Sequence, residues 1–284
     1  MGTIAIVGAG ELGAAIARRL ADRDLAGRVL LVDADESRAR GKALDIRQAG
    51  PVTGSDTVVE GRGHLDGLDS QPDVVIVAEP PNLADAAVPL RAADLVRRLR
   101  PALGRGPLVF AASDAAWLVE GAVAAGLPRG SVLGSAPLAF ASAFRHRLAR
   151  ELDVRATDVT AMVLGLPPDH VVLPLAAVGG LPVEAVWAGG TSRRVLGRLR
   201  GRPLGPFALA AAAAHVVAAL ARPRPATLPI LALLDGEYGC KGIALAVPAR
   251  LGAGGIESVL ELALDPVDRV AFGNAVEARH AARA

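Results

Sequence analysis

Three glycines near the N-terminus have the spacing of a phosphate-binding turn. The β-branched run TIAIV at residues 3–7 leads directly into Gly8, Gly10 and Gly13, and apolar residues at helical spacing follow. Such a turn between a strand and a helix lets the backbone approach a pyrophosphate, and the helix N-terminus offers N–H groups and a positive dipole end to it. The spacing therefore predicts a dinucleotide-binding unit.

Asp33 completes this pattern. It closes the apolar run Val29–Val32 and lies 20 residues beyond Gly13. A carboxylate at this place accepts hydrogen bonds from the adenosine ribose hydroxyls and repels a 2′-phosphate, so the pattern predicts NAD rather than NADP. The alternative interpretation is a glycine turn between strand and helix that holds no ligand.

The elements around these residues alternate. We expect further strands at 73–77, 108–111 and 131–134, and helices at 14–22, 37–48, 89–99 and 115–125. This order predicts an α/β fold with a Rossmann-type, doubly wound parallel sheet over residues 1–134. Past Ser135 the order is less regular, and we expect a second domain at 135–284 that includes an Ala-rich helix at 209–220.

Composition excludes several classes of protein. Hydrophobic residues make up 52% of the chain and charged residues 21%, a globular balance. The net charge of +2 and the aromatic share of 3% argue against a nucleic-acid partner. One cysteine excludes an internal disulfide and a multi-cysteine metal site, and we expect no metal. We find neither a signal peptide nor a membrane span, and so expect a cytoplasmic protein.

With these motifs in order along both halves, the chain resembles the NAD-dependent lactate/malate dehydrogenase family. The matching segments are GAGELG, LVDADESRARGKALDI, GLPRGSVLGS, LARELDV, VGGLPV and, most extensively, LDGEYGCKGIALAVPARLGAGGIESVLEL. The resemblance implies an α+β C-terminal domain of that family's type and assembly into a homodimer or homotetramer. It also implies NAD(H) as cofactor, bound by Gly8, Gly10, Glu11, Leu12, Gly13, Asp33 and Ala78.

The family's catalytic groups are replaced in this chain. The family reduces a 2-keto acid with a histidine held by an aspartate, an arginine that pairs with the substrate carboxylate, a second arginine on a mobile loop, and an asparagine. In this chain, Pro167 stands at the histidine position, Phe140 at the aspartate and Ala143 at the carboxylate-binding arginine. The mobile loop is shortened and has no arginine before Arg91, and the turn Ala111-Ala112-Ser113 lacks the asparagine. Pro80 also stands where the family has a glycine. A proline cannot shuttle a proton and an alanine cannot pair with a carboxylate, so efficient lactate or malate turnover is not expected.

Three residues are candidates for a replacement acid or base. His170 and Asp169 lie in the loop that would present the family histidine, and Glu79 follows the strand at 73–77. Each has a simpler interpretation as a solvated loop residue. For Asp114 we favour a helix N-cap over a site role.

Basic residues elsewhere offer further alternatives. The stretch TSRRVLGRLRGR contains five arginines that are either anion ligands or a solvated or oligomer-contact face: Arg193, Arg194, Arg198, Arg200 and Arg202. On the helix that follows Ser135, we expect Arg145 to meet solvent, and His146 and Arg147 to serve packing or an interface. We expect His215 to be a packed histidine, and Glu237 and Tyr238 to be structural.

Two functions follow from this combination. The leading interpretation is an oxidoreductase that has kept the nicotinamide geometry but acts on a non-standard small-molecule substrate, such as an iminium that needs no strong acid. The alternative is a catalytically inactive protein that senses NAD(H) or serves as a regulatory or scaffold partner. Fold analogy supplies the first, and the site must decide between them.

Overall fold

The computed structural model describes residues 1–65, 71–78, 92–100, 102–104, 106–187 and 190–283. Its first half contains β1 (Thr3–Val7), α1 (Glu11–Ala21), β2 (Arg28–Val32), α2 (Glu36–Thr53), β3 (Val58–Arg62), β4 (Val74–Val77), α3 (Ala92–Leu99), β5 (Leu108–Phe110), α4 (Ala116–Ala124), the 3-10 turn η1 (Arg129–Ser131) and β6 (Val132–Gly134). The expected strands and helices of this half are thus present, several with shifted ends, and β3 is an additional strand. Residues 89–91, the expected start of the helix at 89–99, lie outside the described residues.

The second half is a mixture of antiparallel strands and helices. It contains α5 (Ala136–Leu152), β7 (Val159–Leu166), β8 (His170–Val178), β9 (Leu181–Pro182), α6 (Val183–Val186), α7 (Thr191–Gly197), α8 (Pro206–Leu220), β10 (Ala226–Asp235), the 3-10 turn η2 (Glu237–Gly239), β11 (Lys241–Gly252), β12 (Gly255–Val259) and α9 (Pro266–Ala281). Among the described residues, no helix is long and apolar enough to cross a membrane.

One sheet runs through both halves. Its strand order is β3-β2-β1-β4-β5-β6-β10-β11-β7-β8-β9, with β12 paired to β11. The strands from β3 to β6 are parallel, and β10 joins β6 antiparallel at Leu231 and Gly134. The parallel, doubly wound sheet is the predicted fold class. The expected domain boundary after residue 134 falls where strand direction changes, and it remains a prediction because the hydrogen-bonded sheet continues across it.

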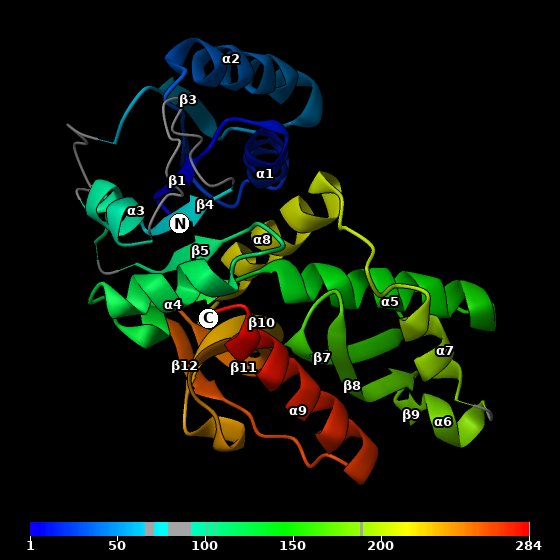
Figure 1. Ribbon diagram of the computed structural model, residues 1–284. Coiled ribbons are helices and arrows are strands. Elements are labelled where there is room, and N and C mark those ends of the chain that lie inside the picture. Colours follow the sequence, from blue (N-terminus) through cyan, green and yellow to red (C-terminus); the bar gives the residue numbers. More distant parts are fainter. Residues whose placement is uncertain (66–70, 79–91, 101, 105, 188–189, 284) are drawn as a thin grey trace.

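Alternating residues of the parallel strands face two separate cores. Ile4 and Ile6 of β1 pack with α1 and α8, whereas Ala5 and Val7 pack with α3 and α4. Figure 1 shows these two helix pairs on opposite sides of the strands. A third core joins α5, α7, β7 and β8. Strands buried on both faces explain the continuous apolar runs by which they were predicted.

The turn between β1 and α1 depends on glycine at two places. Gly8 has a φ of 98°, a left-handed conformation that glycine adopts without strain. A Cβ at Gly13 would overlap the Gly8 carbonyl oxygen and lie 3.4 Å from the Ala78 side chain. Only a residue without a side chain therefore lets α1 come this close to β1 and β4.

A buried ion pair fixes α9 to the rest of the molecule. Arg279 donates to both carboxylate oxygens of Glu120 on α4, at 2.8 and 2.7 Å, and Glu120 also accepts from the Ala244 N–H of β11 at 2.8 Å. The two side chains are 6% and 10% exposed. Three elements far apart in sequence thus meet at one carboxylate.

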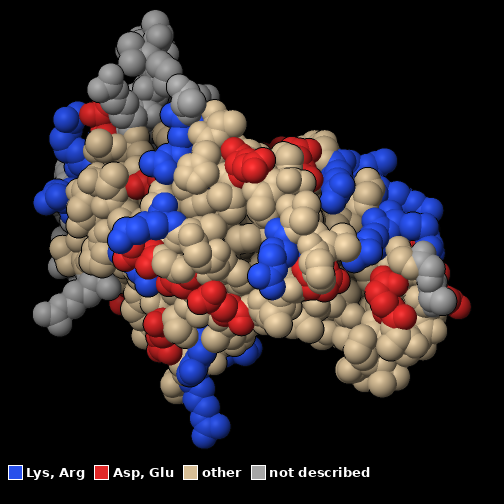
Figure 2. Space-filling model, turned by 60° about the horizontal axis from the view of Figure 1, so that its bottom comes forward, with Lys and Arg blue, Asp and Glu red and all other residues tan. Residues whose placement is uncertain are grey.

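The surface carries both signs of charge. Acidic and basic side chains are interspersed over most of the face drawn in Figure 2. The short ion pairs of the chain include Arg28 with Glu60 at 2.6 Å, both partly exposed, and Arg40 with Glu36 at 2.6 Å, both exposed. An exposed pair such as the second contributes little to stability.

The structure corrects the role expected for Asp114 and agrees with the role expected for Glu237 and Tyr238. Asp114 does not cap α4: the N-cap is Ala115, with no side-chain hydrogen bond. Glu237 and Tyr238 are structural, as expected. Glu237 accepts from the Asp235 N–H at 2.7 Å, and the Tyr238 hydroxyl donates to the Leu260 carbonyl at 2.8 Å.

Replacing Arg279 by alanine should lower the free energy of unfolding by about 3–5 kcal/mol, because it leaves a buried carboxylate without its main partner. The matched control is Arg97→Ala, which removes an exposed pair with Asp94 and should cost less than about 1 kcal/mol. Urea unfolding measures both. A loss for Arg279→Ala no larger than that for Arg97→Ala would contradict the structural role.

Gly13→Ala should destabilise the protein by about 1–3 kcal/mol, because the new methyl group overlaps backbone that cannot move aside. Gly41 lies inside α2, and no described atom stands within 4 Å of the place a Cβ would take there, so Gly41→Ala should stabilise by about 0.5–1 kcal/mol. In thermal or urea unfolding, the free energy of unfolding should fall for Gly13→Ala and rise for Gly41→Ala. Equal changes in the two variants would show that α1 is free to move away from β1.

Candidate active site

The glycine turn opens at the carboxyl end of β1. The Gly8 N–H donates to the Val32 carbonyl at 2.8 Å, which extends the β1–β2 ladder by one bond. Gly10 is the N-cap of α1 and provides no side-chain cap, so the positive end of the helix dipole faces the crevice above the strands. This is the arrangement in which a helix N-terminus binds phosphate.

Asp33 is fixed at the adjacent strand end. Its Oδ2 accepts from the Ala9 N–H at 2.7 Å and its Oδ1 from the Asp35 N–H at 2.9 Å. The side chain is 16% exposed, and the Arg38 guanidinium lies 4.0 Å away. The carboxylate is thereby oriented beside the turn and still reaches the crevice, as a ribose ligand requires.

These observations test whether the chain fits a dinucleotide. Gly13 has no side chain that could stand between the turn and the crevice. Ala78 follows β4 and is fully buried, and its N–H donates to the Val7 carbonyl at 2.9 Å. The structure brings the expected set together at the carboxyl ends of three strands: Gly8, Gly10, Glu11, Leu12, Gly13, Asp33 and Ala78. Their contact with the cofactor remains a prediction, and the residues present fit it.

A small cavity lies further along the same edge of the sheet. Its volume is about 30 Å³, and four segments line it: the loop after β5, α5, the turn between β7 and β8, and the connection from α7 to α8. The lining residues are Ser113, Ala136, Phe140, Pro167, Pro168, Arg202, Pro203 and Leu204. Among these described residues, Arg202 is the one with a charge. A cavity of this volume has room for about one or two water molecules.

Two residues that we expect at positions of the family's catalytic groups are at this cavity. Pro167 and Phe140 both line it, and Phe140 is 1% exposed. Ser113, from the turn expected to have lost its asparagine, contributes a hydroxyl. This part of the cavity is therefore largely apolar, and its correspondence to the family's catalytic positions remains a prediction.

Two of the three candidate replacement acids are not brought into the cavity. His170 is exposed, begins β8 and pairs with Leu166 across a tight turn, so its side chain does not line the cavity. Asp169 is also exposed, and its Oδ1 lies 3.7 Å from where a Cβ of Gly201 would stand, at the rim beside Arg202. Glu79, like Pro80, lies outside the described residues, so its role remains a prediction.

The arginine stretch divides into two parts. Arg193 pairs with Asp265 at 3.7 Å, and Arg194 and Arg198 pair with Glu151 at 3.7 and 2.7 Å. These three belong to a solvated, paired face. Arg202 alone of the stretch lines the small cavity.

Two expectations for basic residues are wrong. Arg145 does not point simply to solvent: its Nε donates to the Val159 carbonyl at 2.6 Å and its Nη2 to the Ala156 carbonyl at 3.2 Å. His215 is exposed rather than packed, because α8 turns that face toward an open cavity. Both residues line this larger cavity, which is distinct from the small one. His146, by contrast, is exposed on α5.

Sequence reasoning missed Ser135. The residue is fully buried between β6 and α5, next to Ala136 of the small cavity. Its hydroxyl has no hydrogen-bond partner among the described residues. A buried hydroxyl without a partner is costly, and Ser135 does not itself line the small cavity. Nothing in the local sequence indicates this, because it depends on which side chains surround the hydroxyl.

Comparison with known proteins agrees with this geometry. Residues 3–83 match the family model for the lactate/malate dehydrogenase NAD-binding domain. The chain is 32% identical to the malate dehydrogenase of Desulforudis audaxviator, over 97% of this chain and 95% of the relative, and 31% identical to that of Chlorobium phaeobacteroides strain BS1, over 92% and 91%.

Solved structures show the same similarity. Malate dehydrogenase from Salinibacter ruber superposes with a TM-score of 0.87 at 28% identity, covering 98% of this chain and 95% of that one. Lactate dehydrogenase from Cryptosporidium parvum, complexed with lactic acid and nicotinamide adenine dinucleotide, superposes with a TM-score of 0.85 at 27% identity, covering 98% and 96%. The chain therefore belongs to the lactate/malate dehydrogenase family and has its NAD-binding fold.

Proposed function

We propose that this protein is an NAD(H)-dependent oxidoreductase for a small, largely apolar carbonyl substrate other than pyruvate or oxaloacetate. The observation that carries this proposal is the lining of the small cavity, where Arg202 is the charged residue beside Pro167 and Phe140. From the family resemblance, we expect Pro167 and Phe140 at the positions of the acid and its orienter. Membership of a family of NAD-dependent dehydrogenases supplies the reaction class.

NAD(H), when bound, supplies or accepts the hydride. Gly8, Gly10 and the N-terminus of α1 hold its pyrophosphate, and Asp33 orients the adenosine ribose. Holding donor and acceptor in contact contributes a large share of the rate by itself.

Arg202 acts on the substrate oxygen in this proposal. Its guanidinium donates hydrogen bonds to the carbonyl oxygen and stabilises the negative charge that develops there as the carbon takes up the hydride. A guanidinium does not release a proton near neutral pH, so the product oxygen takes its proton from water. Arg202 is exposed, and the apolar side chains of Phe140 and Leu204 line the cavity beside it.

The same lining argues against 2-keto acids. A keto acid needs a cation for its carboxylate and a polarising group for its carbonyl, and Ala143 leaves the first of these unfilled. The positive charge of Arg202 also argues against a cationic iminium, which would otherwise need no acid. A neutral carbonyl compound fits the single cation best.

The alternative is a catalytically inactive NAD(H)-binding protein that acts as a sensor or a regulatory or scaffold partner. It is supported by the absence, among the described lining residues of the small cavity, of a group that titrates near neutral pH. We also expect assembly into a homodimer or homotetramer, by analogy with the family.

Asp33→Ala should weaken NADH binding by about 1–3 kcal/mol, because the ribose hydroxyls lose a charged partner. Asp35→Asn is the matched control, since Asp35 caps α2 through the Arg38 N–H and asparagine can keep that bond. Calorimetric titration of both folded variants measures the affinities. Unchanged affinity for Asp33→Ala would remove Asp33 from the site.

A panel of carbonyl substrates, followed through NADH absorbance, tests the reaction. Small neutral aldehydes and ketones should be reduced, whereas pyruvate and oxaloacetate should stay at background. Arg202→Ala should lower kcat/KM by roughly 10²–10³-fold, the scale for one lost oxyanion donor. Arg200→Ala, two residues earlier and away from the cavity, should leave the rate unchanged.

Robust turnover of pyruvate or oxaloacetate would contradict the proposed substrate class. Tight NADH binding with no turnover of any carbonyl compound would favour the inactive alternative. Equal rates for Arg202→Ala and Arg200→Ala would remove Arg202 from the mechanism.

A further inference from the structure

The carboxylate of Glu120 is bonded to two elements that lie far from it in the sequence. Arg279 of α9 donates to both of its oxygens, at 2.8 and 2.7 Å, and the Ala244 N–H of β11 donates to Oε1 at 2.8 Å. The Arg283 guanidinium lies 3.4 Å from Oε2. Stability alone does not require such a buried pair, because well-packed apolar residues of similar volume often serve as well.

Glu120 belongs to the helix that begins at one wall of the small cavity. Ser113 lines the cavity, α4 begins at Ala116, and Glu120 lies about one turn further along this helix. Ala115 and Ala116 are buried in the core that α4 shares with the parallel strands. A shift of Glu120 would therefore move the start of α4 and, with it, the loop that carries Ser113.

The strand β11 connects Glu120 to the opposite wall of the small cavity. Ala244, which donates to Glu120, is two residues from Ala246, and Ala246 pairs with Gly165 of β7. Two residues after Gly165 the chain reaches Pro167, which lines the cavity. The hydrogen bond between Glu120 and β11 therefore lies within a few residues of both walls.

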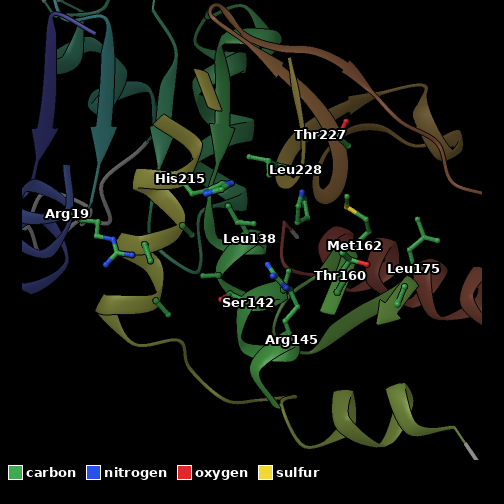
Figure 3. Close-up of a pocket in the computed structure, with 18 of the residues that line it drawn as sticks. Arg19, Leu138, Ser142, Arg145, Thr160, Met162, Leu175, His215, Thr227 and Leu228 are labelled. Atoms are coloured by element: carbon green, nitrogen blue, oxygen red, sulfur yellow. The ribbon is translucent and has the colours of Figure 1, made fainter. Parts of the chain in front are cut away.

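The helix α9 reaches the same point on β7 by a second path. Ala275 lies four residues before Arg279, on the same face of the helix, and both residues are buried. A Cβ at Gly165 would stand 3.2 Å from the Ala275 Cβ and would overlap the His170 carbonyl oxygen. Figure 3 shows α9, in red, behind β7 and β8. The helix thus packs directly on the backbone that leads into the turn between β7 and β8.

We propose that Glu120 and Arg279 are positioning residues for the small cavity. Their ion pair fixes the wall that holds Ser113 relative to the wall that holds Pro167. This inference rests on the proposed function, in which a carbonyl compound is reduced at this cavity beside Arg202. The pair contacts neither substrate nor cofactor, and it acts by keeping the walls in place, since a displacement of about 1 Å can cost on the order of 10²-fold in rate.

Hydrogen–deuterium exchange of the full chain tests the coupling of the two walls without a substrate. Arg279→Met keeps much of the side-chain length and removes the guanidinium. Backbone amides of residues 113–118 and of residues 166–171 should both exchange about tenfold faster or more, because both segments lose one anchor. Amides of the glycine turn, at residues 8–13, should exchange at unchanged rates.

Steady-state reduction of the carbonyl panel supplies the functional measurement. Arg279→Met should lower kcat about tenfold or more and leave the KM for NADH unchanged, because the glycine turn does not depend on the pair. Arg279→Lys can still pair with one carboxylate oxygen and should recover part of kcat. Glu120→Gln keeps an acceptor for the Ala244 N–H, should also lower kcat, and tests the proposal if Arg279→Met fails to fold.

Thr57→Val is the matched control for a general loss of stability. Thr57 is buried, and its hydroxyl donates to the Ala26 carbonyl at 2.8 Å and lies 3.0 Å from Asp24 Oδ1. It stands next to the edge strand β3, whereas β5 and β7 lead to the walls of the small cavity. The free energy of unfolding should fall in this variant while kcat stays unchanged.

Three results would overturn the proposal. The first is an unchanged exchange rate at either wall in both Arg279→Met and Glu120→Gln. The second is exchange that rises equally in the glycine turn, which would indicate a general loosening of the fold. The third is a kcat that falls no further in Arg279→Met than in Thr57→Val. Failure of the unmodified chain to reduce any carbonyl compound would instead contradict the proposed reaction, and exchange at the two walls would then decide whether the pair couples them.

Discussion

The close approach of α1 to β1 is the constraint on which the cofactor crevice depends. Gly13 allows it, because any side chain there would overlap the Gly8 carbonyl oxygen. The approach sets the glycine turn beside the end of β2, where Asp33 accepts from the Ala9 N–H at 2.7 Å. One carboxylate therefore both holds the turn and faces the ribose position. The parallel sheet then places Ala78 and Ser113, after β4 and β5, along the same edge.

The helix α5 connects the two cavities of the molecule. Residues on one of its sides, Ala136 and Phe140, close the small cavity, while Leu138 and Arg145 face the larger one. The same helix also carries two buried aromatic side chains, Phe140 and Phe144, both nearly inaccessible.

Much of the N-terminal half was predictable from the sequence, because the patterns that mark it are local. β-Branched runs predicted β1, β2, β4 and β5, and the glycine spacing predicted the turn. The edge strand β3 was missed, since VVEGR ends in polar residues and pairs on one side with β2 only. The end of the helix expected at 37–48 was placed too early, because α2 continues through Pro51 to Thr53.

The site residues were predictable only where a motif marks them. Pro167 and Phe140 follow from the family resemblance, but the assignment of Arg202, rather than four other arginines, to the small cavity depends on how the chain folds back after α7. Arg145 and His215 were misjudged for the same reason: helical spacing gives the face of a residue but not what stands opposite it. Ser135 carries no sequence pattern at all, because an unpaired hydroxyl is a property of its surroundings.

Hydride transfer requires that the nicotinamide ring of the cofactor be held in place. Calorimetric titration of the protein with NADH and with ADP-ribose tests this most directly, since the two ligands differ by the nicotinamide ring. We expect NADH to bind at least tenfold tighter than ADP-ribose. Equal affinities would mean that the nicotinamide ring is not recognised, and would contradict a hydride-transfer function.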